Sequence, residues 1–220
     1  MVTHRSFGSG EPVTLVGHGL GATPGEARLP TSGLPGTKVV VTLPSHGDAP
    51  DAPEGYWTYP RIAADLRELA RDTGATRAVG VSLTAGALLA LLAREPDAFE
   101  RVVLLLPAVL DEPRPAPTRE EAITAVGGPP GYQAERRAAF ARLGDAPDAL
   151  RGQVAVPDRA ALALVTAPVL VVGATRDPLH PEDVAKQVAA AFPNGRLELV
   201  PSWLTHRDDV RGWLVDFLHG

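Results

Sequence analysis

The sequence predicts an α/β fold with a mostly parallel open sheet of about six strands flanked by helices. Short runs rich in Val and Leu alternate with longer segments of helical periodicity, as in chains whose parallel strands are joined by crossover helices. The strand segments are apolar at nearly every position, which is typical of strands covered on both faces. At 220 residues the chain suits one domain with a sizeable core.

Six segments carry the strand pattern, each five to seven residues long and bounded by Gly, Pro or polar residues. They are residues 12–17, 38–43, 76–82, 101–106, 168–173 and 196–200. In a parallel sheet their carboxyl ends meet at one edge, so the loops that follow them are the natural place for a site.

Four helices are expected between and after these strands. The first covers residues 59–74, where Ile62, Leu66 and Leu69 recur at helical spacing and Gly74 follows the last turn. The other three are residues 83–95, 181–192 and 207–220. Each fits a crossover or flanking helix.

The segment 107–167 breaks the alternation, because about sixty residues separate two strands where a crossover needs far fewer. It contains a Pro/Gly-rich stretch followed by an alanine-rich helical pattern. We interpret it as a small helical cap inserted into the single domain 1–220; the alternative is a disordered surface insertion.

Composition excludes several classes of function. The net charge of −5 offers no basic patch to nucleic acid, and the chain has no cysteine, which excludes disulfides and thiolate sites. No segment has the length of apolar sequence that a signal peptide or membrane span needs. We therefore expect a cytoplasmic protein with a small-molecule substrate, no metal or cofactor, and a monomeric or homodimeric state.

Ser82 is the candidate nucleophile. It lies in "VGVSLTAG" (Val79–Gly86) between a predicted strand and a predicted helix, the arrangement in which Gly-x-Ser-x-Gly exposes a serine. Thr84 fills the second glycine position. We expect it to change the packing behind Ser82 without disabling the turn, because a β-branched residue is tolerated in a first helical turn; the alternative is a helix cap without chemistry.

Acyl transfer needs hydrogen-bond donors for the oxygen that becomes negative. The loop "GHGLG" (Gly17–Gly21) follows the first predicted strand and can direct the Leu20 N–H at the substrate, and the Leu83 N–H is free in the first turn of a helix. The alternative for this loop is a plain tight turn with His18 bonded to nearby backbone.

A serine also needs a base, which in turn needs an acid to orient it. His206, in the loop after the last strand, is the predicted base, and Asp177, just beyond the strand 168–173, is the predicted acid. Asp111 is the rival acid because it follows the preceding strand. His180 is expected beside the site, but in the turn that belongs to another residue.

In this order, Ser82, Asp177 and His206 resemble the triad of the α/β-hydrolase superfamily. "HGLG" resembles its oxyanion loop, "LPSHGDAP" resembles its "PGHG" loop, and "GATRDPLHP" resembles the segment that holds the acid. The resemblance covers nearly the whole chain. Three departures are Thr84, Ser45 in place of a glycine, and a short N-terminal region, from which we expect the usual N-terminal hairpin to be absent or reduced.

The resemblance implies a serine hydrolase that cleaves a carboxylic ester, lactone or thioester. Four further residues are expected to bind substrate: His18, Gly19, His46 and Trp57. The aromatic residues near the "LPSHGDAP" loop and the cap suggest a small to medium apolar substrate, although those aromatics could equally fasten a loop to the core. A non-hydrolytic cyclase or receptor, or a carbon–carbon bond hydrolase, stays an alternative.

Overall fold

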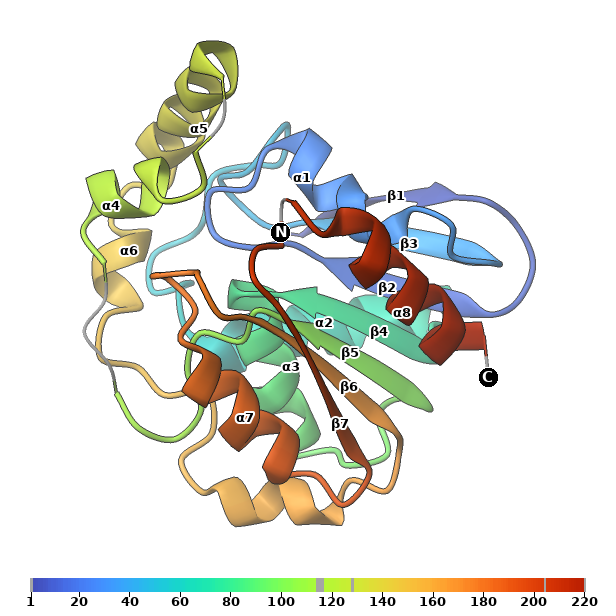
Figure 1. Ribbon diagram of the computed structural model, residues 1–220. Helices are drawn as coiled ribbons and strands as arrows, with labels where there is room; N and C mark the ends of the chain where they lie inside the picture. Colours follow the sequence, from blue (N-terminus) through green and yellow to red (C-terminus); the bar gives the residue numbers. More distant parts are fainter. Residues whose placement is uncertain (1, 114–116, 128, 204, 220) are drawn as a thin grey trace.

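In the computed structural model, one sheet of seven strands runs through the molecule in the order β1-β3-β2-β4-β5-β6-β7. The structure describes residues 2–113, 117–127, 129–203 and 205–219. All neighbouring strands are parallel except β1, which pairs antiparallel with β3. Helices lie on both sides of the sheet (Figure 1). The predicted α/β fold is thus confirmed.

The strands are β1 (Thr3–Phe7), β2 (Val13–Gly17), β3 (Thr37–Thr42), β4 (Arg77–Val81), β5 (Arg101–Leu105), β6 (Val169–Ala174) and β7 (Gly195–Val200). The α-helices are α1 (Pro24–Arg28), α2 (Tyr59–Thr73), α3 (Leu83–Leu92), α4 (Arg119–Thr124), α5 (Pro130–Arg142), α6 (Ala146–Ala149), α7 (Glu182–Ala190) and α8 (Arg207–His219). Two 3-10 helices are η1 (Leu29–Thr31) and η2 (Arg159–Leu164).

The sheet has one strand more than the six segments that the sequence pattern identified. The additional strand, β1, forms the antiparallel edge of the sheet. Its first four residues are exposed, so β1 lacks the apolar run by which the other strands were identified. Pairing with β3, with Thr3 opposite Thr42 and Phe7 opposite Lys38, makes it a strand.

Alternate residues of the strands build a core on each face of the sheet. One face includes Leu15, Leu104 and Val171, packed with residues of α2, α3 and α7. The other includes Val16 and Val103, packed with residues of α8. Figure 1 shows α8 in front of the sheet and α2 and α3 behind it. Coverage on both faces explains the apolar character of the inner strands.

Helix α2 illustrates how local sequence sets the boundaries. The Thr58 hydroxyl accepts a hydrogen bond from the Arg61 N–H at 3.3 Å, and Gly74 ends the helix with a φ of 70°. Its buried residues include Ile62 and Leu66, two of the three that predicted the helix. Caps of this kind satisfy backbone groups that a helix end leaves unpaired.

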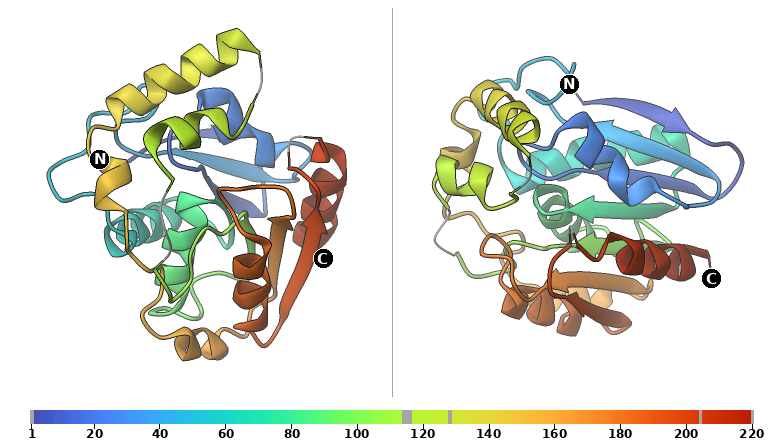
Figure 2. Two further views of the ribbon diagram at one scale, coloured as in Figure 1. Left: turned by 60° about the vertical axis from the view of Figure 1, so that its left-hand side comes forward. Right: turned by 45° about the horizontal axis from the view of Figure 1, so that its top comes forward.

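Segment 107–167, which we call the cap segment, contains α4, α5, α6 and η2. Helices α4 and α5 lie beyond the sheet and pack on each other (Figures 1 and 2). Ile123, Phe140 and Leu143 of this segment are buried in the main core cluster. The described parts of this segment are thus largely helical, with apolar side chains buried in the core.

Among the helices of the described residues, none has both the length and the apolar character required to cross a bilayer.

Candidate active site

Ser82 lies in the turn between β4 and α3 in a strained backbone conformation. Its φ is 50° and its ψ is −102°, a region that costs a non-glycine residue free energy and that is kept where the surrounding structure enforces it. The Ser82 N–H is bonded to the Leu105 carbonyl oxygen at 2.9 Å. This bond to the neighbouring strand fixes the turn at the carboxyl edge of the sheet.

The missing second glycine of the turn is replaced by a hydrogen-bonded threonine. Thr84 is fully buried; its Oγ1 accepts from the Val81 N–H at 2.8 Å and lies 3.2 Å from the Val81 carbonyl oxygen, to which it can donate. A Cβ at Gly17 would lie 2.8 Å from the Thr84 side chain. The space for Thr84 therefore comes from a glycine on β2, while Gly80 keeps the close approach of β4 and α3.

His180 joins Ser82 to Asp177. Its Nε2 lies 2.9 Å from Ser82 Oγ, and its Nδ1 lies 2.8 Å from Asp177 Oδ2. A carboxylate can only accept, so Nδ1 carries the proton and Nε2 is left to accept from the serine hydroxyl. This is the arrangement in which an imidazole acts as a base toward a serine.

A tight turn after β6 brings the acid and the base together. Asp177 Oδ1 accepts from the Leu179 N–H at 2.8 Å, and the His180 N–H is bonded to the Asp177 carbonyl oxygen at 3.3 Å. Burial opposes ionisation of Asp177, but hydrogen bonds from His180 and the backbone outweigh it and lower the pKa of this carboxyl. Asp177 is therefore an anion at neutral pH.

The prediction that His206 contacts Ser82 is corrected by this geometry. His206 Nδ1 lies 3.0 Å from the Ser202 carbonyl oxygen and 2.9 Å from Thr205 Oγ1, and the His206 carbonyl accepts from the Val210 N–H in the first turn of α8. Its ring is thus tied to its own loop. The signal for His180 was its position, three residues after Asp177 in a loop at the correct edge.

The rival acid Asp111 does not contact either histidine. It pairs with Arg159 through both guanidinium nitrogens Nε and Nη2. Hydrogen bonding to Arg159 lowers the pKa of Asp111. Of the two candidate acids, the structure brings only Asp177 to the histidine and serine.

The two predicted oxyanion donors, Leu20 and Leu83, both line the cavity that contains Ser82. Leu83 is the first residue of α3, where a backbone N–H has no acceptor within its own helix. Leu20 lies next to Gly19, at which a Cβ would be 3.4 Å from Ser82 Cβ. The loop after β2 is thus directly beside the serine.

The four predicted substrate-binding residues divide into two pairs. His18 and Gly19 line the cavity, whereas His46 and Trp57 do not. His46 is buried and both of its ring nitrogens are bonded to backbone. Trp57 is buried edge-on against Tyr56 and His46, so these aromatic rings fasten the loop after β3 to the core.

The cavity has a volume of about 300 Å³, at the lower end of the range for small-molecule sites. Its wall is largely apolar and comes from both the sheet edge and the cap segment. The cap contributes Val109, Ala122, Val126, Phe140 and Leu150.

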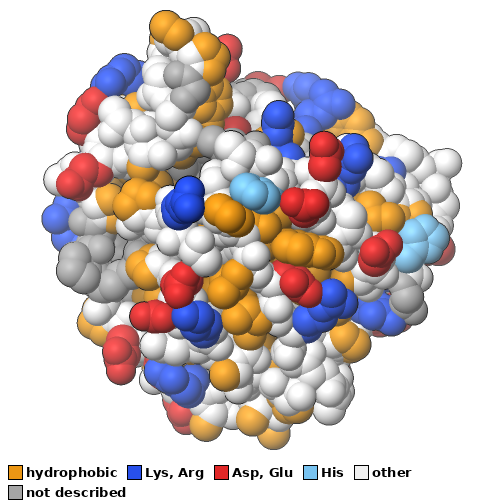
Figure 3. Space-filling model, in the orientation of Figure 1, with side chains coloured by type: hydrophobic (Ala, Val, Ile, Leu, Met, Phe, Trp, Pro, Cys, Tyr) orange, Lys and Arg blue, Asp and Glu red, His pale blue; other side chains and the backbone are white. Residues whose placement is uncertain are grey.

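Figure 3 shows one face of the molecule, on which acidic and basic side chains are interspersed.

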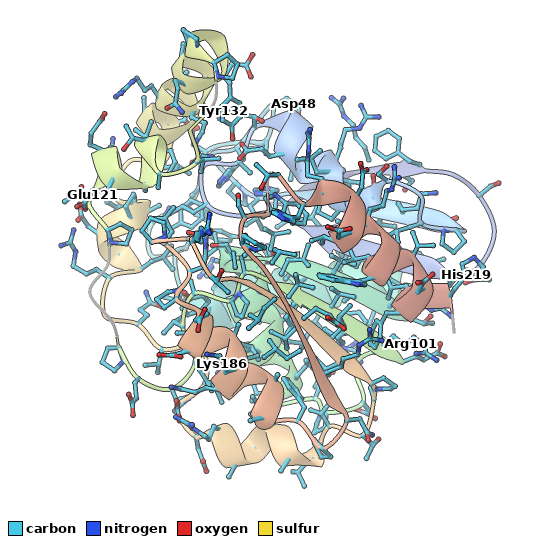
Figure 4. All side chains as sticks on the ribbon, in the orientation of Figure 1. Asp48, Arg101, Glu121, Tyr132, Lys186 and His219 are labelled. Carbon is cyan, nitrogen blue, oxygen red and sulfur yellow. The ribbon has the colours of Figure 1, made fainter. Side chains whose placement is uncertain are left out.

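A buried ion pair connects the cap segment to α1 at the wall of this cavity. Arg136 of α5, whose side chain is 5% exposed, lies 2.9 Å from Glu26 Oε1. Tyr132 donates to the same oxygen at 2.7 Å, and Figure 4 shows it on the side of α5 toward α1. Burial and the bond to Glu26 raise the pKa of Tyr132 to about 12, so it is a neutral donor. No pattern in the sequence pointed to this cluster.

Within the described parts of the chain, no group of three or more His, Asp or Glu side chains is placed to bind a metal ion.

No family model matches the sequence, and no curated protein matches it. Solved structures, however, are similar over almost the whole chain. They include an esterase from Exiguobacterium antarcticum (TM-score 0.79, 19% identity, covering 100% of this chain and 96% of that one). An enol-lactonase from Burkholderia xenovorans LB400 is also similar (TM-score 0.79, 20% identity, covering 100% of this chain and 96% of that one). So is an alpha/beta hydrolase from Sphaerobacter thermophilus (TM-score 0.72, 24% identity, covering 98% of this chain and 95% of that one). At these identities the likeness shows a shared fold.

Proposed function

We propose that this chain, which has the α/β-hydrolase fold, is a serine hydrolase that cleaves a carboxylic ester, lactone or thioester. The observation that carries the proposal is the continuous chain of hydrogen bonds from Asp177 through His180 to Ser82 Oγ. All three residues line one cavity. A serine joined in this way to an imidazole and a carboxylate is the arrangement that makes its hydroxyl nucleophilic.

In the proposed first half-reaction, Ser82 Oγ attacks the substrate carbonyl carbon and His180 Nε2 takes the hydroxyl proton. Asp177 stabilises the imidazolium that forms and keeps its ring oriented. The Leu20 and Leu83 N–H groups would bind the oxyanion of the tetrahedral intermediate. Collapse of the intermediate breaks the bond from the carbonyl carbon to the leaving atom, which is the oxygen of an ester or lactone or the sulfur of a thioester. This leaving atom takes the proton from His180.

In the second half-reaction, water attacks the acyl-enzyme. His180 again accepts the proton, this time from water, and returns it to Ser82 Oγ as the acid leaves. Over both half-reactions, one water molecule is consumed for each ester, lactone or thioester bond that is cleaved. No further group is needed for this chemistry.

The largely apolar wall of the cavity and its volume of about 300 Å³ support a small to medium apolar acyl or alcohol group. The esterase and enol-lactonase among the similar structures support the choice of bond. A cyclase or receptor with the same fold would retain the pocket without turning over esters.

The first test is a series of p-nitrophenyl esters from acetate to octanoate, with Ser82→Ala as the matched variant. We expect hydrolysis of the shorter esters by the wild type, background turnover by the variant, and fluorophosphonate labelling of the wild type only. A folded wild type that neither hydrolyses any ester nor takes the label would contradict the proposal and favour a receptor or cyclase.

A second test separates the two candidate bases. His180→Ala should lower kcat by about 10⁴-fold or more, the order of loss when a triad is disrupted. His206→Ala should keep most of the wild-type kcat, because that ring is bonded to Ser202 and Thr205. The reverse result would assign the base to His206. Circular dichroism of both variants checks that they are folded.

A further inference from the structure

We infer that His18 and His46 are positioning residues that hold the peptide units on either side of Leu20, and thereby direct the Leu20 N–H at the oxyanion. The expected effect of these two residues on catalysis rests on the proposed function. The geometric part of the inference rests only on the contacts of the two rings. Neither residue is placed to touch the reacting atoms.

His18 connects the loop after β2 to the end of β3. Its Nδ1 lies 2.9 Å from the Gly19 carbonyl oxygen, and the Leu43 N–H is bonded to its Nε2 at 3.1 Å. The side chain is 3% exposed. A carbonyl only accepts and an N–H only donates, so the ring must carry its proton on Nδ1.

His46 makes the reciprocal connection, from the loop after β3 back to the loop after β2. The Gly21 N–H donates to its Nε2 at 2.9 Å, and its Nδ1 lies 2.9 Å from the Pro44 carbonyl oxygen. The same reasoning places its proton on Nδ1. The two rings lie with their centroids 4.5 Å apart, so the two loops are joined by a pair of adjacent imidazoles.

These contacts fix Leu20 because of the planarity of the peptide bond. The Gly19 carbonyl and the Leu20 N–H belong to one planar trans unit and point in opposite directions. When His18 holds the carbonyl, it therefore also sets the direction of the Leu20 N–H. The next unit contains the Leu20 carbonyl and the Gly21 N–H, and His46 holds that N–H. Both units that flank the Leu20 Cα are thus braced by a side chain.

Both rings must be neutral for this role, since a protonated Nε2 could not accept from a backbone N–H. Burial lowers the pKa of His18, and burial followed by the proximity of His18 lowers that of His46 to about 3. Neutral, tautomerically fixed rings give a rigid support. Preorganised donors of this kind gain their effect because they need no rearrangement as charge develops.

Paired substitutions distinguish this role from packing alone. The amide nitrogen of Asn matches the position of Nδ1, and the amide oxygen of Gln matches that of Nε2. At position 18, His18→Asn therefore keeps the bond to Gly19, whereas His18→Gln loses it. At position 46 the order reverses: His46→Gln keeps the bond to Gly21, whereas His46→Asn loses it.

The measurement is kcat and KM for the best p-nitrophenyl ester, together with Ki for a trifluoromethyl ketone. This ketone accepts Ser82 Oγ at its carbonyl carbon, its oxygen becomes an oxyanion, and His180 holds the proton. We expect His18→Gln and His46→Asn to lower kcat by about 100-fold, the order seen when an oxyanion donor is lost or misplaced. KM should stay close to the wild-type value, and Ki should rise in step with the loss in kcat/KM. His18→Asn and His46→Gln should retain most of the activity.

Equal activities within each pair, or losses confined to KM, would overturn the inference. An independent measurement does not depend on turnover: imidazole ¹⁵N shifts of the wild type at neutral pH should show the Nδ1–H tautomer at both positions. An Nε2–H tautomer or a charged ring at either position would overturn the inference even in an active enzyme. A wild type inactive toward every ester but with both tautomers as expected would instead contradict the proposed function.

Discussion

At the scale of single residues, Thr84 shows how the turn at Ser82 tolerates the loss of a glycine. Its hydroxyl is bonded to both the N–H and the carbonyl of Val81, so it satisfies backbone groups at the end of β4. Its methyl and Cβ fill the space that Gly17 leaves. Thr84 is 0% exposed and makes two hydrogen bonds, so it is a structural part of the turn.

We predict that Thr84→Val destabilises the protein although it keeps the shape of the side chain. The Val81 N–H would lose its partner inside the core, which costs about 1 to 3 kcal/mol. Thr84→Ser is the control, because it keeps the hydroxyl and removes only a methyl group. Urea unfolding at neutral pH measures both. Equal stability of Thr84→Val and the wild type would show that the hydroxyl contributes nothing to the turn.

The sequence predicted Ser82 and Asp177 because each follows a strongly apolar strand, and strand ends are set by local pattern. The sequence did not distinguish the base as clearly, because it offers two candidates. Both His180 and His206 follow strands and lie in loops at the same edge. The choice depends on the turn between Asp177 and His180 and on the bonds that hold His206 to Ser202 and Thr205, and no periodicity encodes either.

At the scale of elements, α5 contacts the loops after β2 and β3. Phe140 packs so closely on Gly21 that a Cβ there would lie 2.1 Å from its ring. Arg142 donates to the Ala49 carbonyl oxygen at 2.9 Å and pairs with Asp51. Together with the Arg136–Glu26 pair, these contacts make α5 a clamp on the loops after β2 and β3.

We predict that Glu26→Gln weakens this clamp. The substitution leaves the Arg136 guanidinium buried without a counter-charge, and breaking a buried pair in this way costs about 3 to 5 kcal/mol. The matched control is Glu120→Gln, which removes the partner of Arg137 in a pair whose side chains are 51% and 62% exposed. That exposed pair should contribute little to stability, because water screens its charges.

Thermal unfolding and limited proteolysis within 107–167 measure the two variants. Glu26→Gln should unfold at a lower temperature and be cleaved faster in the cap segment than the wild type, while Glu120→Gln should match the wild type. If both variants behaved alike, the buried pair would not hold the cap segment in place.

Element prediction succeeded where burial imposes a pattern and failed where it does not. The inner strands, buried on both faces, were identified from their apolar runs. Strand β1 lies at the edge of the sheet with its first four residues exposed, and its sequence THRSF carries one aromatic residue. Its strand conformation comes from pairing with β3, which is a long-range contact that a local window of sequence does not contain.

At the scale of the whole molecule, the two buried histidines connect catalysis to acid stability. His46 is 2% exposed, and its pKa is lowered from 6.5 to about 3, mainly by burial and then by His18. In the unfolded chain it titrates near its ordinary value, about 6.5. Between those two values the unfolded state binds a proton that the native state does not.

The free energy of unfolding should therefore fall as pH is lowered from 6.5 toward 3, with a contribution from His46 of about 1.4 kcal/mol per pH unit, or about 2 kcal/mol at pH 5. Above pH 6.5 both states are neutral at this site and the contribution vanishes.

His46→Gln removes the titrating group, so the stability of this variant should depend less steeply on pH than that of the wild type, and the two curves of stability against pH should converge on acidification. His219→Gln, which removes an exposed imidazole at the end of α8, is the control for the loss of a histidine at the surface. Urea unfolding between pH 7.5 and 5 measures all three proteins; parallel curves for His46→Gln and the wild type would show that His46 takes up its proton in the native state, which is incompatible with the bond from Gly21 to its Nε2.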